Sequence, residues 1–410
     1  MSAERAPADR AAPLRVLFVA PYYKPNWGGI ERAIDRLSAE LRAAGHHTGI
    51  LATHYVFPRQ FRPGLPDREI IDADAGGGMA MFRLPSWPHR APPCFSVPLV
   101  WFPPRAFAAA LDEFRPDIIH WIGDGWFWGH FWTWWYGRGR AAIVFTPSFH
   151  RLIPAYRWLQ PLNILLCRAA DRITALSAIE RRGLARTYLA PRRRVRQIGW
   201  GVAAPDDDGQ APQGWEPGRL TILCVGRLGE HKGQRWLLDR LPAVRARLPD
   251  DSPPLRLVLV GRDEGAEGAL RERIARDNLG DLVLLTGEVD DGELRRWYAH
   301  ADLFALFSQY EAFGLVYLEA LAYGLPIVTH AVGATAEVLP PGAGAIVVPP
   351  FDAPAAEAAL AALLSDGARR DVLGQAGRAL AAGQAWPNIA ARFVAVYREA
   401  LARREARVAG

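Results

Sequence analysis

Arg15-Val-Leu-Phe-Val-Ala20 begins the pattern that decides the fold, because this pattern occurs twice along the 410 residues. The apolar stretch predicts a buried strand, and the loop after it carries Lys24 and the pair Gly28-Gly29. Apolar residues then recur at helical spacing, at Ile30, Ile34, Leu37 and Leu41, until Gly45 ends the run. The chain therefore starts with a strand, a glycine-containing loop and a helix.

The same order returns in the second half at Leu220-Thr-Ile-Leu-Cys-Val225. A loop from Gly226 to Gly233 follows, and after it comes one predicted helix with an apolar face of Trp236, Leu237, Leu241 and Val244. Further short apolar stretches that predict strands lie at residues 117–120, 142–145, 172–175, 257–260, 283–285, 303–306 and 327–329. Alternation of strands and helices predicts parallel sheets covered by helices, which is the α/β class.

The two halves are separated by a polar stretch rich in proline and glycine, which we interpret as a linker. The predicted parts are an N-terminal domain at 13–203, the linker at 204–218, a C-terminal domain at 219–385, and a final helix at 386–410 that crosses back to the N-terminal domain. Parallel sheets bind ligands beyond the carboxyl ends of their strands. We therefore expect the loops of Lys24 and Lys232 to point into one cleft between the domains.

Composition is that of an ordinary globular protein, with 50% hydrophobic and 22% charged residues. The three cysteines are scattered without metal-ligand spacing, so we expect buried thiols in a reducing, cytoplasmic setting. No apolar run reaches the roughly 18 residues of a membrane-spanning helix. The net charge of +6 is modest, and we expect no nucleic-acid partner.

Glu311-Ala-Phe-Gly-Leu-Val-Tyr-Leu-Glu319 joins a predicted strand to a helix that runs from about Leu315 to Tyr323. Free amides and the positive dipole at a helix N-terminus attract phosphate, and Gly314 lets such a ligand approach the backbone. Glu319, about one turn further in, can accept two hydrogen bonds from a vicinal diol such as ribose. On local grounds alone, Glu311 is equally well interpreted as a solvated loop acid and Glu319 as a carboxylate that merely suits an early helical turn.

The loop of residues 226–233 favours the binding interpretation. Arg227 and Lys232 supply two cations after a strand, and Glu230 is the carboxylate near them in the sequence. The compact ammonium of lysine suits a phosphate as a point charge. The two loops together predict a site for a diphosphate leaving group.

These segments resemble glycosyltransferase family 4, the retaining GT-B enzymes also described as glycosyl transferases group 1. The resemblance covers nearly the whole chain and rests on Glu311 to Glu319, Gly226-Arg227, Lys232-Gly233 and Gly28-Gly29. It implies a GT-B fold of two Rossmann-like domains that face each other across a cleft. It also implies transfer of a sugar, with retention, from a nucleotide-diphosphate donor to an acceptor hydroxyl in surface polysaccharide, glycolipid or lipid-linked glycan synthesis.

The resemblance assigns roles to individual residues. Arg227 and Lys232 would bind the donor diphosphate and stabilise the departing nucleotide in place of a metal, so no metal or other cofactor is expected. Glu319 would hold the ribose, and Glu311 would contact the donor sugar near the reacting carbon. The remaining donor-binding candidates are Gly28, Gly29, Gly226, Phe313, Gly314 and Leu315.

An active-site histidine is common in this family after an N-terminal strand, and Thr146-Pro-Ser-Phe-His150 lies in that region. His150 is therefore the candidate, although Ser148 stands where relatives frequently carry a second histidine. His120, near the end of another predicted strand, is the competing candidate. At the domain junction Trp200-Gly201-Val202-Ala203 replaces the usual Asn-Gly-Val-Asp, so the linker geometry is expected to differ.

Residues 121–136 are unusually rich in aromatic side chains. Trp128, Phe131, Trp132 and Trp135 share one helical face that we interpret as core. Trp126 and Trp134 would then point elsewhere, toward a sugar acceptor or a membrane interface. Arginines between 181 and 196 form a patch that suits either anionic headgroups or water. The expected partners are a nucleotide-sugar donor, a glycan or lipid-linked acceptor and an anionic membrane surface.

Two other functions would use the same diphosphate and ribose residues. One is an epimerase that eliminates and re-adds the nucleotide without an acceptor, and the other is a non-catalytic subunit that binds nucleotide sugars. A nicotinamide dehydrogenase is a poorer alternative than either of these, because neither glycine loop has the Gly-x-Gly-x-x-Gly pattern.

Overall fold

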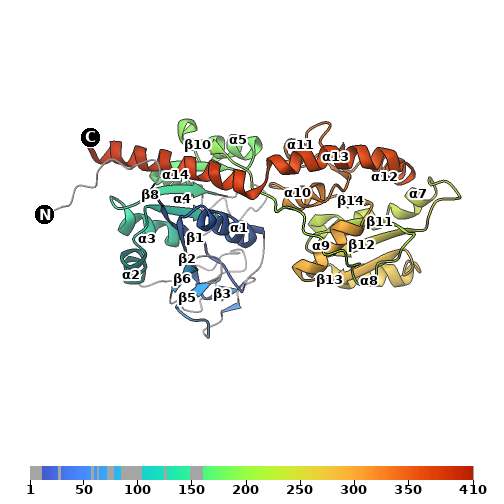
Figure 1. The fold of residues 1–410 in the computed structure, drawn as a ribbon, viewed down its shortest axis with the longest axis horizontal. Helices are drawn as coiled ribbons and strands as arrows, with labels where there is room; N and C mark the ends of the chain where they lie inside the picture. The colour runs from blue at the N-terminus through green and yellow to red at the C-terminus, as the bar shows by residue number, and fades with distance from the viewer. Residues whose placement is uncertain are drawn as a thin grey trace. The chain divides into compact units, whose positions relative to one another are not determined.

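The structure is a computed structural model that describes residues 12–25, 29–56, 60–61, 64–71, 78–84, 104–123, 127–147 and 160–409. The chain forms two compact units (Figure 1). Unit 1 comprises Met1–Trp200 together with Trp386–Gly410, and unit 2 comprises Gly201–Ala385. Each unit is built on its own sheet with helices packed against it, so the predicted α/β class is confirmed.

The sheet of unit 1 has the strand order β10-β9-β8-β7-β1-β2-β6-β5. Its strands are β1 Arg15–Val19, β2 His47–Thr53, β5 Arg68–Ile71, β6 Met79–Leu84, β7 Ile118–Ile122, β8 Ala142–Thr146, β9 Arg172–Ala175 and β10 Val195–Gln197. All neighbours pair in parallel except β5 with β6. A separate short hairpin joins β3 Tyr55–Val56 to β4 Gln60–Phe61.

The helices of unit 1 are α1 Gly29–Ala43, α2 Pro104–Phe114, α3 Phe127–Gly137, α4 Gln160–Ala169, α5 Ala178–Thr187, the single 3-10 turn Arg192–Arg194 and α14 Trp386–Ala409. The C-terminal helix α14 packs on α1, β8 and β9. Its buried Tyr397 hydroxyl lies 2.9 Å from His120 Nδ1 in the sheet, and Glu399 pairs with Arg172 at the start of β9. The last helix is therefore part of the N-terminal unit.

Unit 2 has an all-parallel sheet in the order β13-β12-β11-β14-β15-β16. Its strands are β11 Leu220–Val225, β12 Leu255–Val260, β13 Val283–Gly287, β14 Leu303–Leu306, β15 Ile327–His330 and β16 Ala345–Val348. Its helices are α6 Gln234–Leu238, α7 Leu241–Arg245, α8 Glu267–Arg276, α9 Asp291–His300, α10 Leu315–Ala322, α11 Thr335–Val338, α12 Ala353–Ser365 and α13 Gly367–Gly383, with a 3-10 turn at Glu230–Lys232.

The single helix predicted after Gly233 is wrong, because the structure has two short helices there, α6 and α7. Pro242 lies in the first turn of the second helix, which begins at Leu241, and has no backbone N–H to donate to the preceding turn. The predicted apolar face nevertheless packs inward, since Leu237, Leu241 and Val244 are fully buried.

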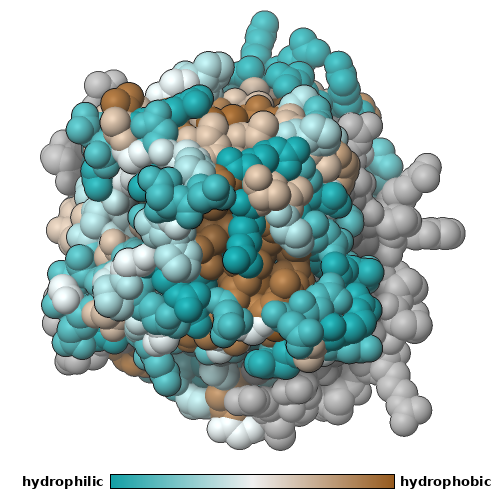
Figure 2. Space-filling model, turned by 90° about the vertical axis from the view of Figure 1, so that its right-hand side faces the viewer, coloured by the Kyte–Doolittle hydropathy of each residue, from teal (hydrophilic) through white to brown (hydrophobic). Residues whose placement is uncertain are grey.

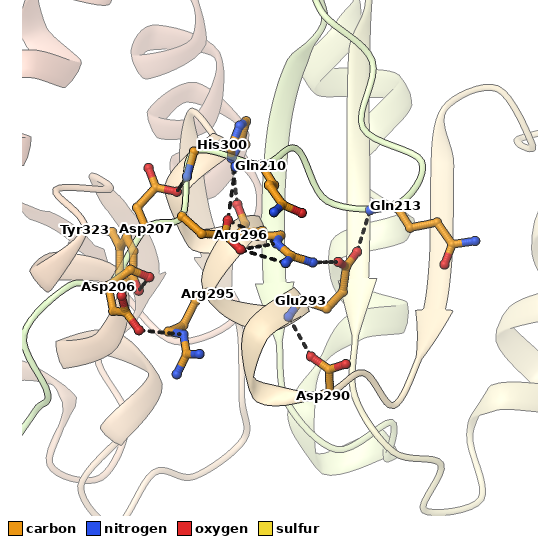
Figure 3. A network of polar contacts seen from close by, with 12 residues as sticks. Asp206, Asp207, Gln210, Gln213, Asp290, Glu293, Arg295, Arg296, His300 and Tyr323 are labelled. Atoms are coloured by element: carbon orange, nitrogen blue, oxygen red, sulfur yellow. Dashed lines mark hydrogen bonds and ion pairs between the residues drawn. The ribbon is translucent and has the colours of Figure 1, made fainter.

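The stretch 204–218, expected as a linker, lies along α9 of unit 2 (Figure 3). Both oxygens of Asp208 accept hydrogen bonds from Arg296, and this bonding lowers the pKa of Asp208 to about 2. Further along, the rings of Trp215 and His300 meet edge to face, with their centroids 5.1 Å apart. The contacts of Asp208 with Arg296 and of Trp215 with His300 hold residues 204–218 against the surface of unit 2.

Figure 2 shows one face of unit 2, where hydrophilic residues surround a hydrophobic hollow. Within the described residues, no helix is both long enough and apolar enough to cross a membrane.

Candidate active site

The expected donor-binding residues of unit 2 come from loops at the carboxyl ends of two of its strands. Residues 226–233 follow β11 and residues 307–314 follow β14, and these two strands are hydrogen-bonded neighbours. Because all strands of this sheet run in parallel, the two loops lie together beyond the carboxyl ends. The predicted site residues of this domain are therefore brought together.

Lys232 and Glu311 form the central contact of this site. The Nζ atom of Lys232 lies 2.6 Å from Oε1 of Glu311, and their side chains are only 17% and 9% exposed. The buried Ser308 hydroxyl donates to the same oxygen over 2.8 Å. Glu311 is thus not a solvated loop acid. It is largely buried, and its carboxylate accepts hydrogen bonds from the Lys232 ammonium and the Ser308 hydroxyl.

Gly233 allows these two loops to approach each other. It has φ +74°, and a Cβ atom built there would lie 2.1 Å from the backbone oxygen of Phe307. Any side chain would therefore push residues 226–233 away from the loop after β14. The glycine after Lys232 is what brings the ammonium within reach of Glu311.

Arg227, the second cation of the loop, pairs with Glu264 from the loop after β12. Glu264 Oε2 also lies 3.8 Å from His231 Nε2. Burial lowers the pKa of His231, and the positive charge of Lys232 lowers it further. Glu230 is the nearest carboxylate in the sequence, but the counter-charges of Arg227 and Lys232 come from Glu264 and Glu311 in other loops.

The helix α10 begins at Gly314, which has φ +83° and is left-handed. A Cβ atom there would lie 2.4 Å from the ring of the buried Tyr317, so the turn requires glycine. No side chain of the described part caps the first amides of α10. Phe313 and Leu315 flank this turn and are both half-buried. Open amides on a glycine turn are the arrangement that binds phosphate.

Glu319 lies one turn further along α10 and is half-buried. Its Oε2 atom accepts a hydrogen bond of 3.0 Å from the hydroxyl of Tyr298 on α9. The carboxylate therefore has a fixed position on the same helix whose first turn offers amides.

The candidates of unit 1 are only partly described. Gly29 is exposed and begins α1, whereas Gly28, Ser148 and His150 lie outside the described residues, as does Trp126. Lys24, expected to point into a cleft, pairs with Asp35 of α1 at 2.9 Å.

His120 is a core residue. Its ring is fully buried, with Nδ1 2.9 Å from the Tyr397 hydroxyl and Nε2 2.7 Å from the Thr146 hydroxyl. Burial lowers the pKa of His120 to about 3, so the ring stays neutral. These contacts give His120 a structural role in joining α14 to the sheet, and His150 stays the predicted active-site histidine.

The prediction for the aromatic helix α3 is only partly right. Trp128 and Trp135 of the face that we interpreted as core are 40% and 43% exposed, whereas Trp132 is partly buried against the core. Trp134, expected to point elsewhere, also packs partly against the core. The fully buried ring of His130 stacks on Trp121, and a Cβ atom at Gly137 would lie 2.4 Å from Cδ1 of Ile119. This close approach leaves no room for an indole ring at the position of Gly137.

Comparison with known proteins decides the family. Residues 27–204 match the family model described as Glycosyltransferase Family 4, and residues 219–366 match Glycosyl transferases group 1. Aligned over 98% of both chains, D-inositol 3-phosphate glycosyltransferase 1 of Catenulispora acidiphila is 30% identical. The chain belongs to glycosyltransferase family 4.

Another relative and a solved structure are also similar to this chain. A GDP-mannose-dependent alpha-(1-6)-phosphatidylinositol monomannoside mannosyltransferase of Mycolicibacterium smegmatis is 32% identical over 51% of this chain and 57% of its own. The solved sucrose-phosphate synthase of Thermosynechococcus elongatus superposes with a TM-score of 0.73 at 24% identity, covering 93% of this chain and 98% of the other. The predicted GT-B fold and the prediction of a glycosyltransferase are confirmed.

Three residues that contact the candidate site residues were not predicted from the sequence. Ser308 lies three residues before Glu311, so its spacing was a usable signal. Glu264 and Tyr298 contact Arg227 and Glu319 from other loops and helices, and nothing local marks them. Among the described residues, no group of three or more histidine, cysteine or acidic side chains is arranged to hold a metal ion.

Proposed function

We propose that this family 4 glycosyltransferase transfers a sugar from a nucleotide-diphosphate donor to an acceptor hydroxyl with retention of configuration. The observation that carries the proposal is the buried contact between Lys232 and Glu311 beside the open first turn of α10. A donor diphosphate at that turn would meet backbone amides on one side and the Lys232 ammonium on the other. Retention rests on the family resemblance.

The chemistry proposed for this site is electrostatic stabilisation of the leaving nucleotide. Negative charge builds on the diphosphate as the glycosidic bond breaks, and Lys232 and Arg227 are placed to balance it. Each cation is paired with a carboxylate, so the arriving phosphate competes with Glu311 for Lys232. Once the phosphate has displaced Glu311 from Lys232, the Glu311 carboxylate would still lie beside residues 226–233, where it would orient the donor sugar.

We propose that these two cations do the work that a metal ion does in other transferases. The proposal predicts full activity in excess chelator, and a strict magnesium requirement would contradict it.

Variants of the two donor contacts test the proposed function. Lys232→Ala is expected to lower kcat by about 100- to 1,000-fold, the usual cost of losing one preorganised charge or donor in an active site. Glu319→Ala is expected to raise KM for the donor by about tenfold or more, since hydrogen bonds to a charged group contribute about 1.5–3 kcal/mol. Donor consumption and the anomeric configuration of the product, followed by NMR, provide the measurement.

A matched control removes a positive charge elsewhere on unit 2. Arg245 is exposed on α7, and Arg245→Ala should leave both constants unchanged. Wild-type rates for Lys232→Ala and Glu319→Ala would refute the site. Conversion of the donor into its epimer without an acceptor would refute the transferase reaction.

For the acceptor, we propose a lipid-linked or surface glycan reached at the cytoplasmic face of an anionic membrane. The name of the mycobacterial relative describes an acceptor built on phosphatidylinositol. On this chain, α3 presents Trp128 and Trp135 outward, and the guanidinium of Arg138 lies 3.8 Å from the ring centre of Trp135. Amphipathic indole rings beside a cation suit the headgroup region of a bilayer.

Co-sedimentation with vesicles tests the membrane proposal. The double variant Trp128→Ala and Trp135→Ala should bind anionic phospholipid vesicles about tenfold or more weakly at low salt, because burying a large apolar side chain contributes roughly 1.5–3 kcal/mol. The control Val372→Ala removes an exposed apolar side chain from α13 of unit 2 and should change nothing. No binding of the wild-type protein to such vesicles would overturn the proposal.

A further inference from the structure

Tyr298 on α9 is a buried tyrosine whose hydroxyl meets the ribose candidate Glu319. Its side chain is 2% exposed, and its hydroxyl donates to Oε2 of Glu319 over 3.0 Å. One face of its ring stacks on Tyr323, with centroids 5.7 Å apart and planes 19° apart. Phe304 stacks on Tyr298 as well, at 6.2 Å. The ring is thus held in place by two aromatic neighbours.

Tyr323 is itself anchored by the stretch that joins the units in sequence (Figure 3). Its hydroxyl donates to the backbone oxygen of Asp206 and accepts from the backbone N–H of the same residue, both over 3.1 Å. Asp206 also pairs with Arg295 of α9 at 3.6 Å. The Tyr323 hydroxyl thus bonds to the backbone of Asp206, whereas Tyr323 meets Tyr298 through its ring.

A hydrogen bond from a fixed phenol strongly restricts the rotamers that a glutamate side chain can adopt. A free glutamate side chain loses up to about 2 kcal/mol of rotamer entropy when it is ordered, and here the protein orders it before any ligand arrives. A carboxylate has about four acceptor positions, so one bond to Tyr298 is compatible with two more from a diol.

We infer that Tyr298 is a positioning residue for ribose recognition, which holds the Glu319 carboxylate so that it accepts the two ribose hydroxyls of the donor nucleotide. The inference rests on the ribose role of Glu319 in the proposed function. Tyr298 acts through Glu319 and does not touch the donor. Its effect must therefore depend on the presence of the ribose hydroxyls.

Calorimetric titration of the full chain with nucleoside diphosphates tests the inference. UDP, GDP and ADP are compared first, and the one that binds most tightly is then compared with its 2′,3′-dideoxy analogue. The wild-type protein should prefer the ribonucleotide. Tyr298→Phe should reduce that preference by about fivefold to tenfold, the equivalent of one hydrogen bond, and leave the affinity for the dideoxy analogue unchanged.

Two controls separate positioning from a general effect on the fold. Tyr323→Phe removes the neighbouring hydroxyl, which contacts Asp206 and not Glu319, and should keep the wild-type preference. In a Glu319→Ala background, Tyr298→Phe should have no further effect on the preference.

Three outcomes would overturn the inference, and they differ from one another. If the wild-type protein binds both analogues equally, the ribose role of Glu319 in the proposed function fails, and the role of Tyr298 fails with it. If the wild-type protein prefers ribose and Tyr298→Phe prefers it equally, the positioning role alone fails. If Tyr298→Phe weakens both analogues to the same extent, the tyrosine serves only the fold.

Discussion

Arg227 and Lys232 meet carboxylates before any donor is bound, and this pairing sets the charge that an arriving diphosphate encounters. The pair of Arg227 with Glu264 is more exposed than that of Lys232 with Glu311, so water screens it and it is weak. Glu264→Gln should therefore release Arg227 and tighten nucleoside diphosphate binding by about twofold to fivefold at low salt. Titration calorimetry at two salt concentrations checks this, and the gain should shrink at the higher one.

Glu272→Gln is the control for Glu264→Gln, since it makes the same charge change at an exposed position of α8. It should leave the affinity unchanged. Weaker binding by Glu264→Gln would mean that Glu264 orients Arg227 rather than competing with the phosphate.

Residue types in this site were predictable, but their partners were not. Lys232 and Glu311 both follow strands in recognisable loops, yet 79 residues separate them. Contacts of this kind depend on which strands become neighbours in the sheet, and the local sequence does not determine the strand order. Glu264 illustrates the limit, because no local feature distinguishes it from the adjacent acid Asp263.

At the scale of elements, the donor-site helix α10 depends on close contact with α13. A Cβ atom at Gly374 of α13 would lie 2.4 Å from the backbone oxygen of Gly324, just after α10. A backbone carbonyl cannot rotate away, so Gly374→Ala should separate the helices and destabilise the protein by about 1–3 kcal/mol. Urea unfolding measures this change.

The control for Gly374→Ala lies on the same helix. At Gly383 a Cβ atom would meet nothing within 4 Å, so Gly383→Ala should be neutral or stabilise by up to about 1 kcal/mol. Equal effects of the two substitutions would show that helix propensity, and not the contact with α10, determines stability here.

Elements with a continuous apolar run were predicted to the residue, as for β9, β11 and β14. Buried parallel strands give this signal because both of their faces are covered. The edge strand β5 gave no such signal, since its residues alternate between exposed and half-buried. For α3 the helix was predicted but its buried face only in part, because the residues closest to the sheet are Gly137, Thr133 and His130 rather than the tryptophans Trp128 and Trp135.

At the scale of the whole molecule, two repeats of strand, glycine loop and helix were enough to predict two α/β units. The repeats do not show that the chain returns to unit 1 at Trp386. That return depends on contacts such as Tyr397 with His120, which join positions 277 residues apart. A pattern with a period of a few residues carries no information over that distance.

Each unit has its own core and its own stabilising contacts. In calorimetric unfolding of the full chain, we therefore expect unit 1 and unit 2 to give separate transitions, each shifted by changes in its own unit. Tyr397→Phe leaves Nδ1 of the buried His120 without this partner, which should cost unit 1 about 1–3 kcal/mol and lower its transition by a few degrees. A nucleoside diphosphate at about 100 times its Kd should stabilise unit 2 by about 2.7 kcal/mol and raise only that transition. A single transition that both perturbations shift alike would contradict this separation, since it would require the units to unfold as one cooperative body.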